Sequence, residues 1–340
     1  MSSRKYTGNI TPEKIVEMIT KSRNIVLTTH VNPDGDAVGS MIAFYLMIEE
    51  YNRSHIRNEQ EYIRVDMIID DKLPKYMEHF QEKSLISRYD ETILNREFDL
   101  FISLDCANEE RYGSSVNIKR KCRKSINIDH HISNTGHADF NYVEDVSSTS
   151  ELIYQFLSLF WIGLTKRAAD FMYLGIINDT GNFRHDNVTA ETFRVCSEIR
   201  KVGTDNHKIS DIIFGISMKK IDLIGDVYRN KAVDEGYRFI YYYLPYEKMK
   251  AMGIEKDDTD GIAEMLLRIE GTEISMLMRE EEDGMIKGSL RSNDKYDVNE
   301  IASVFNGGGH IKAAGFKTGL PYGEIIGKIY EMLEKDNEGM

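Results

Sequence analysis

The segment 29–40 constrains this chain more than any other part of its sequence. The apolar run 25–29 predicts a buried strand, a Pro and a Gly after it predict a tight turn, and the stretch 38–48 predicts a helix. Ligands in open α/β sheets bind at the carboxyl ends of the strands, so polar groups on this turn form a candidate metal site. The groups are one imidazole and two carboxylates: His30, Asp34 and Asp36.

Three more clusters of acidic or imidazole side chains stand at the ends of apolar runs. One short cluster of this kind arises easily by chance. Four in succession indicate that the groups converge in the folded chain around a shared metal centre. The runs and the groups that follow them are 98–104 with Asp105, 125–128 with Asp129, His130 and His131, and 171–177 with Asp179.

The remaining patterns predict two domains of different kinds. Strands and helices alternate up to about residue 185, which favours a parallel sheet with helices on both faces. A largely helical stretch follows, and then several strands, two of them joined by an acidic, Gly-containing turn. We therefore expect an α/β protein with a mostly parallel N-terminal sheet flanked by helices, a helical connector, and a smaller C-terminal α+β domain with a mixed sheet. The expected boundaries are 10–186, 187–230 and 231–335.

The four blocks resemble the four motifs of the DHH phosphoesterase superfamily, which is named for the Asp-His-His found here at 129–131. Farther on, Asn306–His310 and Ala313–Phe316 resemble the glycine-rich signature of the C-terminal domain associated with that family. Together the two resemblances cover nearly the whole chain. The nearest likeness is to the branch that contains nano-RNases (oligoribonucleases) and phosphatases of 3′-phosphoadenosine 5′-phosphate (pAp).

The resemblance implies a role for each group in the four motifs. His131 is similar to the family's non-ligand histidine, which contacts the scissile phosphate and assists proton transfer at the leaving oxygen. With Asp105 it forms the expected catalytic pair. Asp129 is not an expected ligand but would contact a histidine and fix its tautomer. The implied ligands are His30 and Asp34 for one ion, Asp36, His130 and Asp179 for the other, and Asp105 as the bridge between them.

Two divalent ions suit these residue types and this chemistry. Ions about 3.5 to 4 Å apart can stabilise both the attacking and the leaving oxygen in phosphoester hydrolysis. Imidazoles among carboxylates suit manganese better than a site lined only by oxygen. We therefore expect Mn²⁺ as the best activator, with Mg²⁺ or Co²⁺ as alternatives.

The C-terminal signature indicates residues that hold the substrate. Glycines let backbone amides approach a phosphate closely, while a tight turn before a helix is the structural alternative for the same run. The planar fork of an arginine meets phosphate oxygens bidentately, and Ser289–Ser292 resembles the family segment that binds the terminal phosphate. The expected substrate-binding residues are Arg291, Ser292, Gly307, Gly308, Gly309 and His310.

We expect a hydrolase that releases nucleoside monophosphates from short oligonucleotides and dephosphorylates pAp. The main alternative is a soluble phosphodiesterase of linear or cyclic dinucleotides such as pApA and cyclic di-AMP, which the residues do not separate from it. An inorganic pyrophosphatase is disfavoured by the glycine-rich signature. A nucleotide- or RNA-binding module without activity is disfavoured by the complete ligand set.

Composition limits the partners. The 340 residues carry a formal net charge of −13, which argues against long duplexes, whose binding requires many Lys and Arg contacts to phosphates. Short RNA or DNA oligonucleotides or small nucleotides need few contacts. The sequence has no apolar stretch of about 18 residues and no signal-peptide core, so we expect a cytoplasmic protein without membrane contact. A homodimer is left open, and three cysteines at unrelated spacings suggest no disulfide framework.

Overall fold

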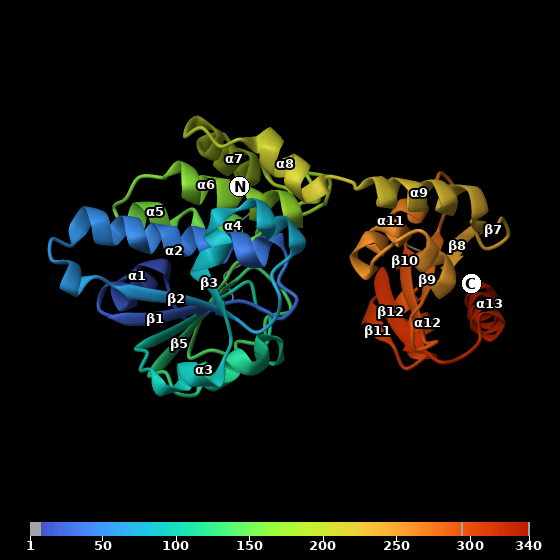
Figure 1. Ribbon diagram of the computed structural model, residues 1–340, viewed down its shortest axis with the longest axis horizontal. Helices are drawn as coiled ribbons and strands as arrows, with labels where there is room; N and C mark the ends of the chain where they lie inside the picture. The colour runs from blue at the N-terminus through green and yellow to red at the C-terminus, as the bar shows by residue number, and fades with distance from the viewer. Residues whose placement is uncertain (1–7, 294, 339–340) are drawn as a thin grey trace. The chain divides into compact units, whose positions relative to one another are not determined.

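The structure is a computed structural model that describes residues 8–293 and 295–338 (Figure 1). It divides into two compact units, Met1–Gly215 and Ile216–Met340. Within the described ranges, no helix has both the length and the apolar character needed to cross a membrane.

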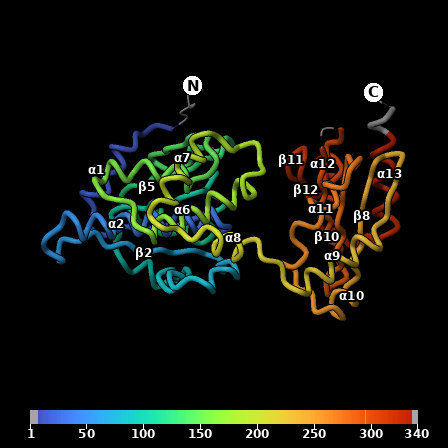
Figure 2. The backbone as a smooth tube through the Cα atoms, turned by 90° about the horizontal axis from the view of Figure 1, so that it is seen from above, coloured from blue at the N-terminus to red at the C-terminus, as the bar shows by residue number. Residues whose placement is uncertain are grey.

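Three helices form the segment for which the sequence predicts a connector. Helices α7 (Ala190–Lys201) and α8 (Asn206–Phe214) belong to the first unit, where both pack against α6 (Lys166–Asp179). Helix α9 (Met218–Asn230) belongs to the second unit. The chain passes from α8 into α9 through a short non-helical stretch, which Figure 2 shows in yellow.

The N-terminal unit contains a six-stranded sheet in the order β3-β2-β1-β4-β5-β6, and every neighbouring pair is parallel. The chain builds the sheet outward from β1 to β3, then returns and builds it in the other direction from β4. In such sheets, ligands bind where this direction reverses, beyond the carboxyl ends of the strands. The strands are β1 Asn24–Thr28, β2 Arg64–Ile69, β3 Ile86–Arg88, β4 Leu100–Leu104, β5 Lys124–Asp129 and β6 Phe140–Val143.

Both faces of this sheet are covered, as expected for a parallel sheet. Alternate residues of β1 point to opposite sides: Ile25 and Leu27 join a core with α1, α2 and α6, whereas Val26 joins a smaller core with Tyr112 and Ile118. Figure 1 shows α2 and α6 on one side of the sheet and α3 on the other. The further helices are α1 Pro12–Thr20, α2 Gly35–His55, α3 Val116–Lys119, α4 Thr149–Ile153 and α5 Phe156–Leu159, with 3₁₀ helices at Glu59–Glu61, Lys75–His79, Gln81–Leu85, Glu91–Asn95 and Glu109–Ser115.

Two glycines allow α2 and α6 to pack closely beside the carboxyl edge of the sheet. A Cβ on Gly39 of α2 would lie 2.6 Å from the carbonyl oxygen of Phe171 in α6. A Cβ on Gly175 of α6 would lie 1.9 Å from Ser150 Oγ and 2.6 Å from Asp36 Oδ1. Gly39 therefore lets the two helices approach, and the absence of a side chain at Gly175 leaves the space in which the Asp36 carboxylate lies.

The C-terminal unit contains a mixed sheet in the order β11-β12-β10-β9-β8-β7, in which only β8 and β9 are parallel among the described pairs. One face packs on α12 and α13, and the other on α9, α10 and α11. The elements are β7 Ala232–Asp234, β8 Phe239–Leu244, α10 Tyr246–Ala251, α11 Ile262–Leu267, β9 Ile274–Glu280, β10 Ile286–Ser292, α12 Val298–Ser303, β11 Gly308–His310, β12 Ala313–Thr318 and α13 Tyr322–Glu338, with a 3₁₀ helix at Lys256–Thr259.

Replacing Gly39 with Ala should destabilise the N-terminal unit, although Ala favours helices over Gly. The new Cβ would crowd the Phe171 carbonyl oxygen at 2.6 Å, and overpacking costs about 1–3 kcal/mol. The matched control is Gly225→Ala in α9, where no atom of the described chain lies within 4 Å of the added Cβ and stability should rise by about 0.5–1 kcal/mol. Urea unfolding with hydrogen exchange in α2 and α9 measures both. A Gly39→Ala variant as stable as the parent would contradict the close packing.

Candidate metal centre

Three neighbouring strands end at the candidate site. In the sheet, β1, β4 and β5 lie side by side; His30 follows β1, Asp105 follows β4, and Asp129 ends β5. Asp105 has a left-handed backbone conformation with φ +56°, which Asp tolerates better than most residues. Its N–H donates to the Ile128 carbonyl oxygen at 3.0 Å. The site therefore lies at the carboxyl edge, where the strand order reverses between β1 and β4.

Two helices supply the other carboxylates. Asp34 is the N-cap residue of α2, Asp36 lies in the first turn of the same helix, and Asp179 is the last residue of α6. One oxygen of Asp34 accepts hydrogen bonds from the backbone of Asp36 and Ala37 at 3.0 and 3.1 Å. The other lies 3.7 Å from His30 Nε2. The helix cap thus orients the second oxygen of Asp34 toward the site.

Asp36 is fully buried, and its carboxylate is held by the start of α4. The backbone N–H of Thr149 donates to Asp36 Oδ2 at 2.6 Å, and that of Ser150 donates to Oδ1 at 2.8 Å. Such charge-assisted bonds offset the cost of removing a carboxylate from water. The sequence predicts a helix start near these two residues but does not predict that it holds Asp36.

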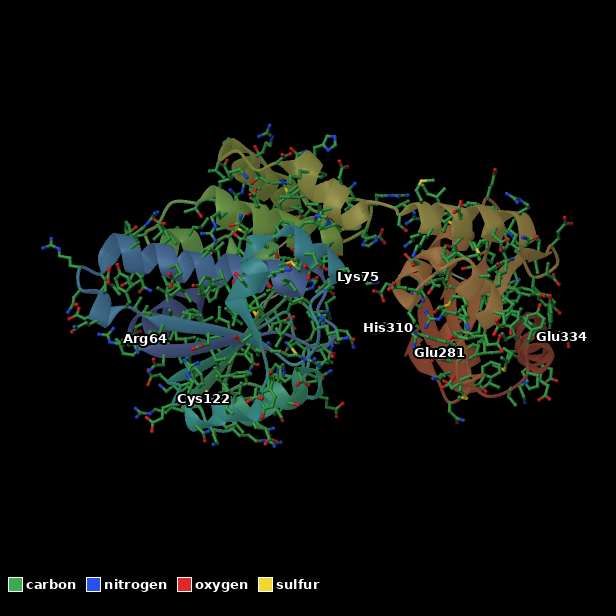
Figure 3. All side chains as sticks on the ribbon, in the orientation of Figure 1. Arg64, Lys75, Cys122, Glu281, His310 and Glu334 are labelled. Atoms are coloured by element: carbon green, nitrogen blue, oxygen red, sulfur yellow. The ribbon has the colours of Figure 1, made fainter. Side chains whose placement is uncertain are left out.

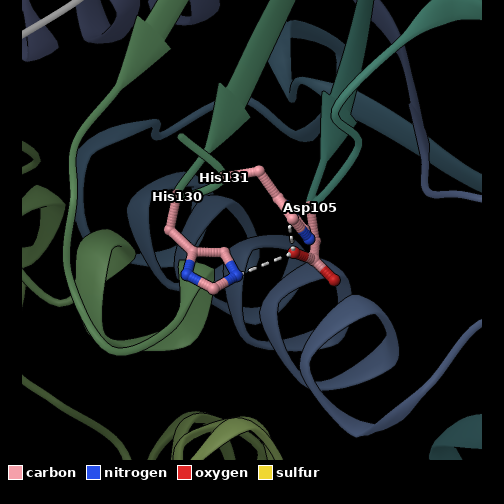
Figure 4. Close-up of side chains that lie close together, drawn as sticks. All are labelled: Asp105, His130 and His131. Atoms are coloured by element: carbon pink, nitrogen blue, oxygen red, sulfur yellow. Dashed lines mark ion pairs between the residues drawn. The ribbon is translucent and has the colours of Figure 1, made fainter. Parts of the chain in front are cut away.

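Asp105 belongs to three overlapping groups of ligand-type side chains. Its Oδ2 lies 3.5 Å from His30 Nε2, and its Oδ1 lies 3.5 Å from His130 Nε2 and 3.6 Å from His131 Nδ1 (Figure 4). The two oxygens of one carboxylate thus face histidines from different strands, as a bridging ligand requires. The groups, each with ligand atoms within 4.8 Å of one another, are His30, Asp34 and Asp105; Asp36, Asp105, His130 and Asp179; and Asp105, His130 and His131.

The charges of this cluster shift one another's pKa. Burial, together with the carboxylates of Asp179 and Asp105, raises the pKa of Asp36 well above its usual value. Burial also raises the pKa of Asp179. Burial opposes protonation of His30, but its interactions with Asp105 and Asp34 outweigh this and raise its pKa to about 10. The carboxylates thus draw protons into the cluster, and divalent cations would relieve the same excess of negative charge.

His130 gives a separate test of whether the cluster fits a metal. Its Nδ1 lies 3.1 Å from the Val146 carbonyl oxygen, so the neutral ring donates there and keeps its lone pair on Nε2. Nε2 is buried and makes no hydrogen bond of normal geometry to a described residue. Oxygens of Asp179 and Asp105 nevertheless lie 3.1 and 3.5 Å away. A buried nitrogen facing two carboxylates fits a cation among them.

His131 and Asp129 form a pair beside the cluster. Asp129 is fully buried, and its Oδ1 lies 2.8 Å from His131 Nδ1. The side chain of His131 is 32% exposed, so its ring is open to solvent, unlike that of His30. Asp129 therefore contacts a histidine as the sequence predicts, and that histidine is the partly exposed His131.

Two further contacts at the site have no motif in the sequence that indicates them. Arg111 lies six positions after Asp105, and its Nη2 is 2.9 Å from His30 Nδ1. Its carbonyl oxygen accepts from Val31 N–H at 2.7 Å. His185 Nδ1 lies 2.9 Å from the carbonyl oxygen of Asp179. These residues support the ends of β1 and α6, and only the folded chain brings them there.

The candidate substrate residues lie in the C-terminal unit, on adjoining strands. In the sheet register, Arg291 of β10 pairs with Ala313 of β12, which pairs with His310 of β11. Directly paired residues point to the same face, so Arg291 and His310, the latter labelled in Figure 3, share one face of this sheet. Arg291 Nε donates to Glu264 Oε1 at 2.6 Å.

Ser292 and the glycine run make contacts within the C-terminal unit that the sequence does not indicate, while their role in substrate binding stays a prediction. The Ser292 hydroxyl is buried and donates to the carbonyl oxygen of Tyr296 at 2.7 Å, so it secures a turn. Gly308–His310 is an edge strand, neither an open loop nor a turn before a helix. A Cβ on Gly307 would lie 2.3 Å from the Gly315 carbonyl oxygen, and one on Gly309 would lie 2.4 Å from that of Ala313. Close approach to β12 therefore requires these two glycines.

Two family models match the chain. The DHH family, N-terminal domain, matches residues 24–176, and the DHHA1 domain matches residues 236–335. The bifunctional oligoribonuclease and PAP phosphatase NrnA of Thermus thermophilus is 26% identical over 316 residues, which cover 92% of this chain and 90% of that protein. The protein of the same name from Bacillus subtilis is 25% identical, with 89% and 91% covered.

A solved structure agrees with these matches. The crystal structure of an exopolyphosphatase-related protein from Bacteroides fragilis has a TM-score of 0.83 and 26% identity to this chain, with 95% of each chain covered. The two family models match residues within the two compact units, one model in each unit. The four acidic and imidazole motifs meet in the first unit. On these grounds the chain carries the N-terminal domain of the DHH family, followed by a DHHA1 domain.

Proposed function

We propose that this protein is a metal-dependent phosphoesterase that releases nucleoside monophosphates from short oligonucleotides and removes the 3′-phosphate of pAp. The observation that carries the proposal is the shared carboxylate of Asp105, whose two oxygens face His30 and His130. The name of the two relatives, bifunctional oligoribonuclease and PAP phosphatase, supports the same two substrates. Their similarity extends over about nine-tenths of both chains.

We assign two divalent cations to the cluster, with Mn²⁺ preferred because imidazoles are mixed with carboxylates. His30 and Asp34 would hold one and Asp105 would bridge both. Asp36, His130 and Asp179 would hold the other, which accords with the buried Nε2 of His130 that faces the carboxylates of Asp179 and Asp105. When bound, such cations would neutralise charge on the phosphoryl group and lower the pKa of an attacking water.

The protein's own groups orient the reaction around this centre. Asp34 and Asp36 are fixed by backbone N–H groups and so need little reorganisation. His131, 32% exposed and held by Asp129 through Nδ1, keeps Nε2 available to accept a proton and, once protonated, to transfer it to the leaving oxygen. This role requires that the proton on the neutral ring stay on Nδ1, and the buried Asp129 carboxylate would keep it there.

We propose that the DHHA1 domain holds the far end of the substrate and the N-terminal domain cuts, with 10–186 as the catalytic part, 187–230 as the connector and 231–335 as the substrate-binding part. Arg291 and His310 share a sheet face and offer donors to a phosphate. Few such contacts suffice for a short substrate, which accords with the chain's net charge of −13.

A substrate panel with the full chain and Mn²⁺ tests the proposal. We expect turnover of dinucleotides and pAp, and little turnover of cyclic diadenylate or pyrophosphate. Asp105→Asn should reduce this turnover on the order of 10³-fold, since the loss of several kcal/mol of transition-state stabilisation has that effect. Asn tolerates the φ of +56° at this position, so the variant should fold.

The matched control for Asp105→Asn is Asp170→Asn in α6, where a carboxylate that is 21% exposed forms an ion pair with the exposed Lys166. Its turnover should equal that of the parent, since such pairs contribute little. If Asp105→Asn keeps Mn²⁺-dependent release of mononucleotides, the bridging assignment is wrong. If the parent hydrolyses only cyclic diadenylate or pyrophosphate, the substrate assignment is wrong.

Cation binding should release protons at neutral pH. The pKa of His30 is raised to about 10 by its carboxylate neighbours, so below that pH its ring carries a proton that a cation bound at Nε2 must displace. We therefore expect release of about one proton at pH 7 when the cation assigned to His30 binds, and weaker Mn²⁺ binding as the pH falls. Calorimetry in buffers of different ionisation enthalpy measures the release. Binding without it would exclude His30 as a ligand.

Arg291→Ala should raise KM for pAp about 10- to 100-fold, with a smaller effect on kcat, because hydrogen bonds to charged groups contribute about 1.5–3 kcal/mol. Arg291→Lys should recover only part of the loss, since Lys lacks the planar fork. Arg268→Ala removes the same charge from an exposed position of the same unit and serves as the control. Equal KM values in all three variants and the parent would contradict the assignment.

A further inference from the structure

Two strands of the N-terminal sheet carry buried polar side chains that the proposed reaction does not use. Ser103 in β4 and Asn127 in β5 are paired in the sheet and are fully buried. The other residues of β4 are all apolar. Burying a hydroxyl or an amide costs free energy unless it is hydrogen-bonded, so an apolar residue would serve packing at either position equally well.

These side chains belong to one continuous hydrogen-bonded row. Tyr112, also fully buried, has its hydroxyl 2.7 Å from Ser103 Oγ. Asn127 Nδ2 donates to Ser103 Oγ at 3.0 Å and to the Cys106 carbonyl oxygen at 3.1 Å. Asn127 Oδ1 in turn accepts from Asn134 Nδ2 at 2.7 Å. The amide of Asn127 is thereby fixed in one orientation, and it fixes that of Asn134.

The row ends on the carboxylate beside the catalytic histidine. Asn134 Nδ2 donates to Asp129 Oδ2 at 2.5 Å, and Asp129 Oδ1 lies 2.8 Å from His131 Nδ1. One oxygen of Asp129 is thus occupied by an amide that cannot ionise, and only the other is left for the imidazole. In a low-dielectric surrounding, a chain of satisfied hydrogen bonds of this kind specifies one geometry.

We infer that Asn134 is a positioning residue which, through Asp129, fixes the orientation and the tautomer of His131, with Asn127 as its support. The inference rests on the proposed function for the role of His131, but the contacts that carry it do not depend on the substrate. Without the Asn134 amide, the Asp129 carboxylate can rotate about its own axis, and His131 loses a fixed acceptor for Nδ1–H.

A structural role in the loop is the competing explanation, and one substitution separates the two. Asn134 Oδ1 accepts from Gly136 N–H at 2.8 Å, which stabilises the turn after the Asp-His-His motif. Asn134→Asp keeps this acceptor and the size of the side chain. It replaces the donor to Asp129 by a second carboxylate oxygen, so it disturbs Asp129 while leaving the turn in place.

The matched control is Asn141→Asp on β6. Asn141 likewise accepts through Oδ1 from a backbone N–H, that of Ala138 at 3.2 Å, and donates through Nδ2 to the carbonyl oxygen of the same residue at 2.8 Å. The chemical change is the same, but the side chain has no bond to Asp129. This variant should keep the kcat, the KM and the His131 spectrum of the parent.

For Asn134→Asp we expect kcat for pAp to fall about 10- to 100-fold, the range for residues that hydrogen-bond a functional side chain and orient it. KM and Mg²⁺ affinity should stay within about twofold of the parent. In ¹⁵N histidine spectra of the full chain with Mg²⁺, His131 should change from a single Nδ1–H tautomer to a mixture. The double variant Asp129→Asn with Asn134→Asp restores a donor–acceptor pair and should exceed Asp129→Asn alone in kcat.

The outcomes distinguish this inference from the proposed function. If Asn134→Asp keeps both the kcat and the His131 tautomer of the parent, the inference is wrong. It is also wrong if kcat falls while the tautomer is unchanged and the double variant recovers nothing, because Asn134 is then a loop residue only. If the parent hydrolyses none of the panel, the proposed function fails, and the tautomer in Asn134→Asp still decides for or against the inference.

Discussion

The buried carboxylate of Asp105 is the group on which the arrangement of the N-terminal unit depends. It is only 1% exposed, and imidazoles that follow β1 and β5 face its two oxygens. An ionised group at this depth is costly unless opposite charges or donors surround it. Three more carboxylates, from two helices, surround the carboxylate of Asp105. Their negative charges repel one another, and bound cations would offset this repulsion. The parallel strand order, which brings β1 and β5 to either side of β4, makes this convergence possible.

Close packing supplies the rest of the site. Asp36 is held between the start of α4, which donates two N–H groups, and the backbone of α6, where Gly175 leaves room for it. A residue with a side chain at that glycine would occupy the volume of the carboxylate. In the same unit the buried Asp129 contacts the partly exposed His131 and accepts a hydrogen bond from Asn134. Rigid supports behind ligands and catalytic groups reduce the reorganisation that a reaction would otherwise require.

Strong local patterns predicted most of the fold correctly. The strand before Asp105 is mostly apolar, the strand that ends in Asp129 alternates isoleucine with polar residues, and the mixed C-terminal sheet has clear strand and turn signals. Short edge strands gave no such signal: β3 and β7 have three residues each. The approach of the glycine run 307–309 to a phosphate stays a prediction. In the structure Gly307 and Gly309 approach the backbone of β12 closely, and nothing local specifies which backbone a glycine will approach.

The sequence by itself determined which residue types follow each strand and in what order, because a turn after an apolar run is a local feature. It therefore indicated His30, Asp105, Asp129 and Asp179 as groups that meet at one sheet edge. Only the tertiary structure decided which oxygen faces which ring, that α4 holds Asp36, and that Arg111 and Asn134 reach the site at all. Those contacts join residues from separate elements, and their distances depend on helix packing and strand order, which short-range sequence patterns do not encode.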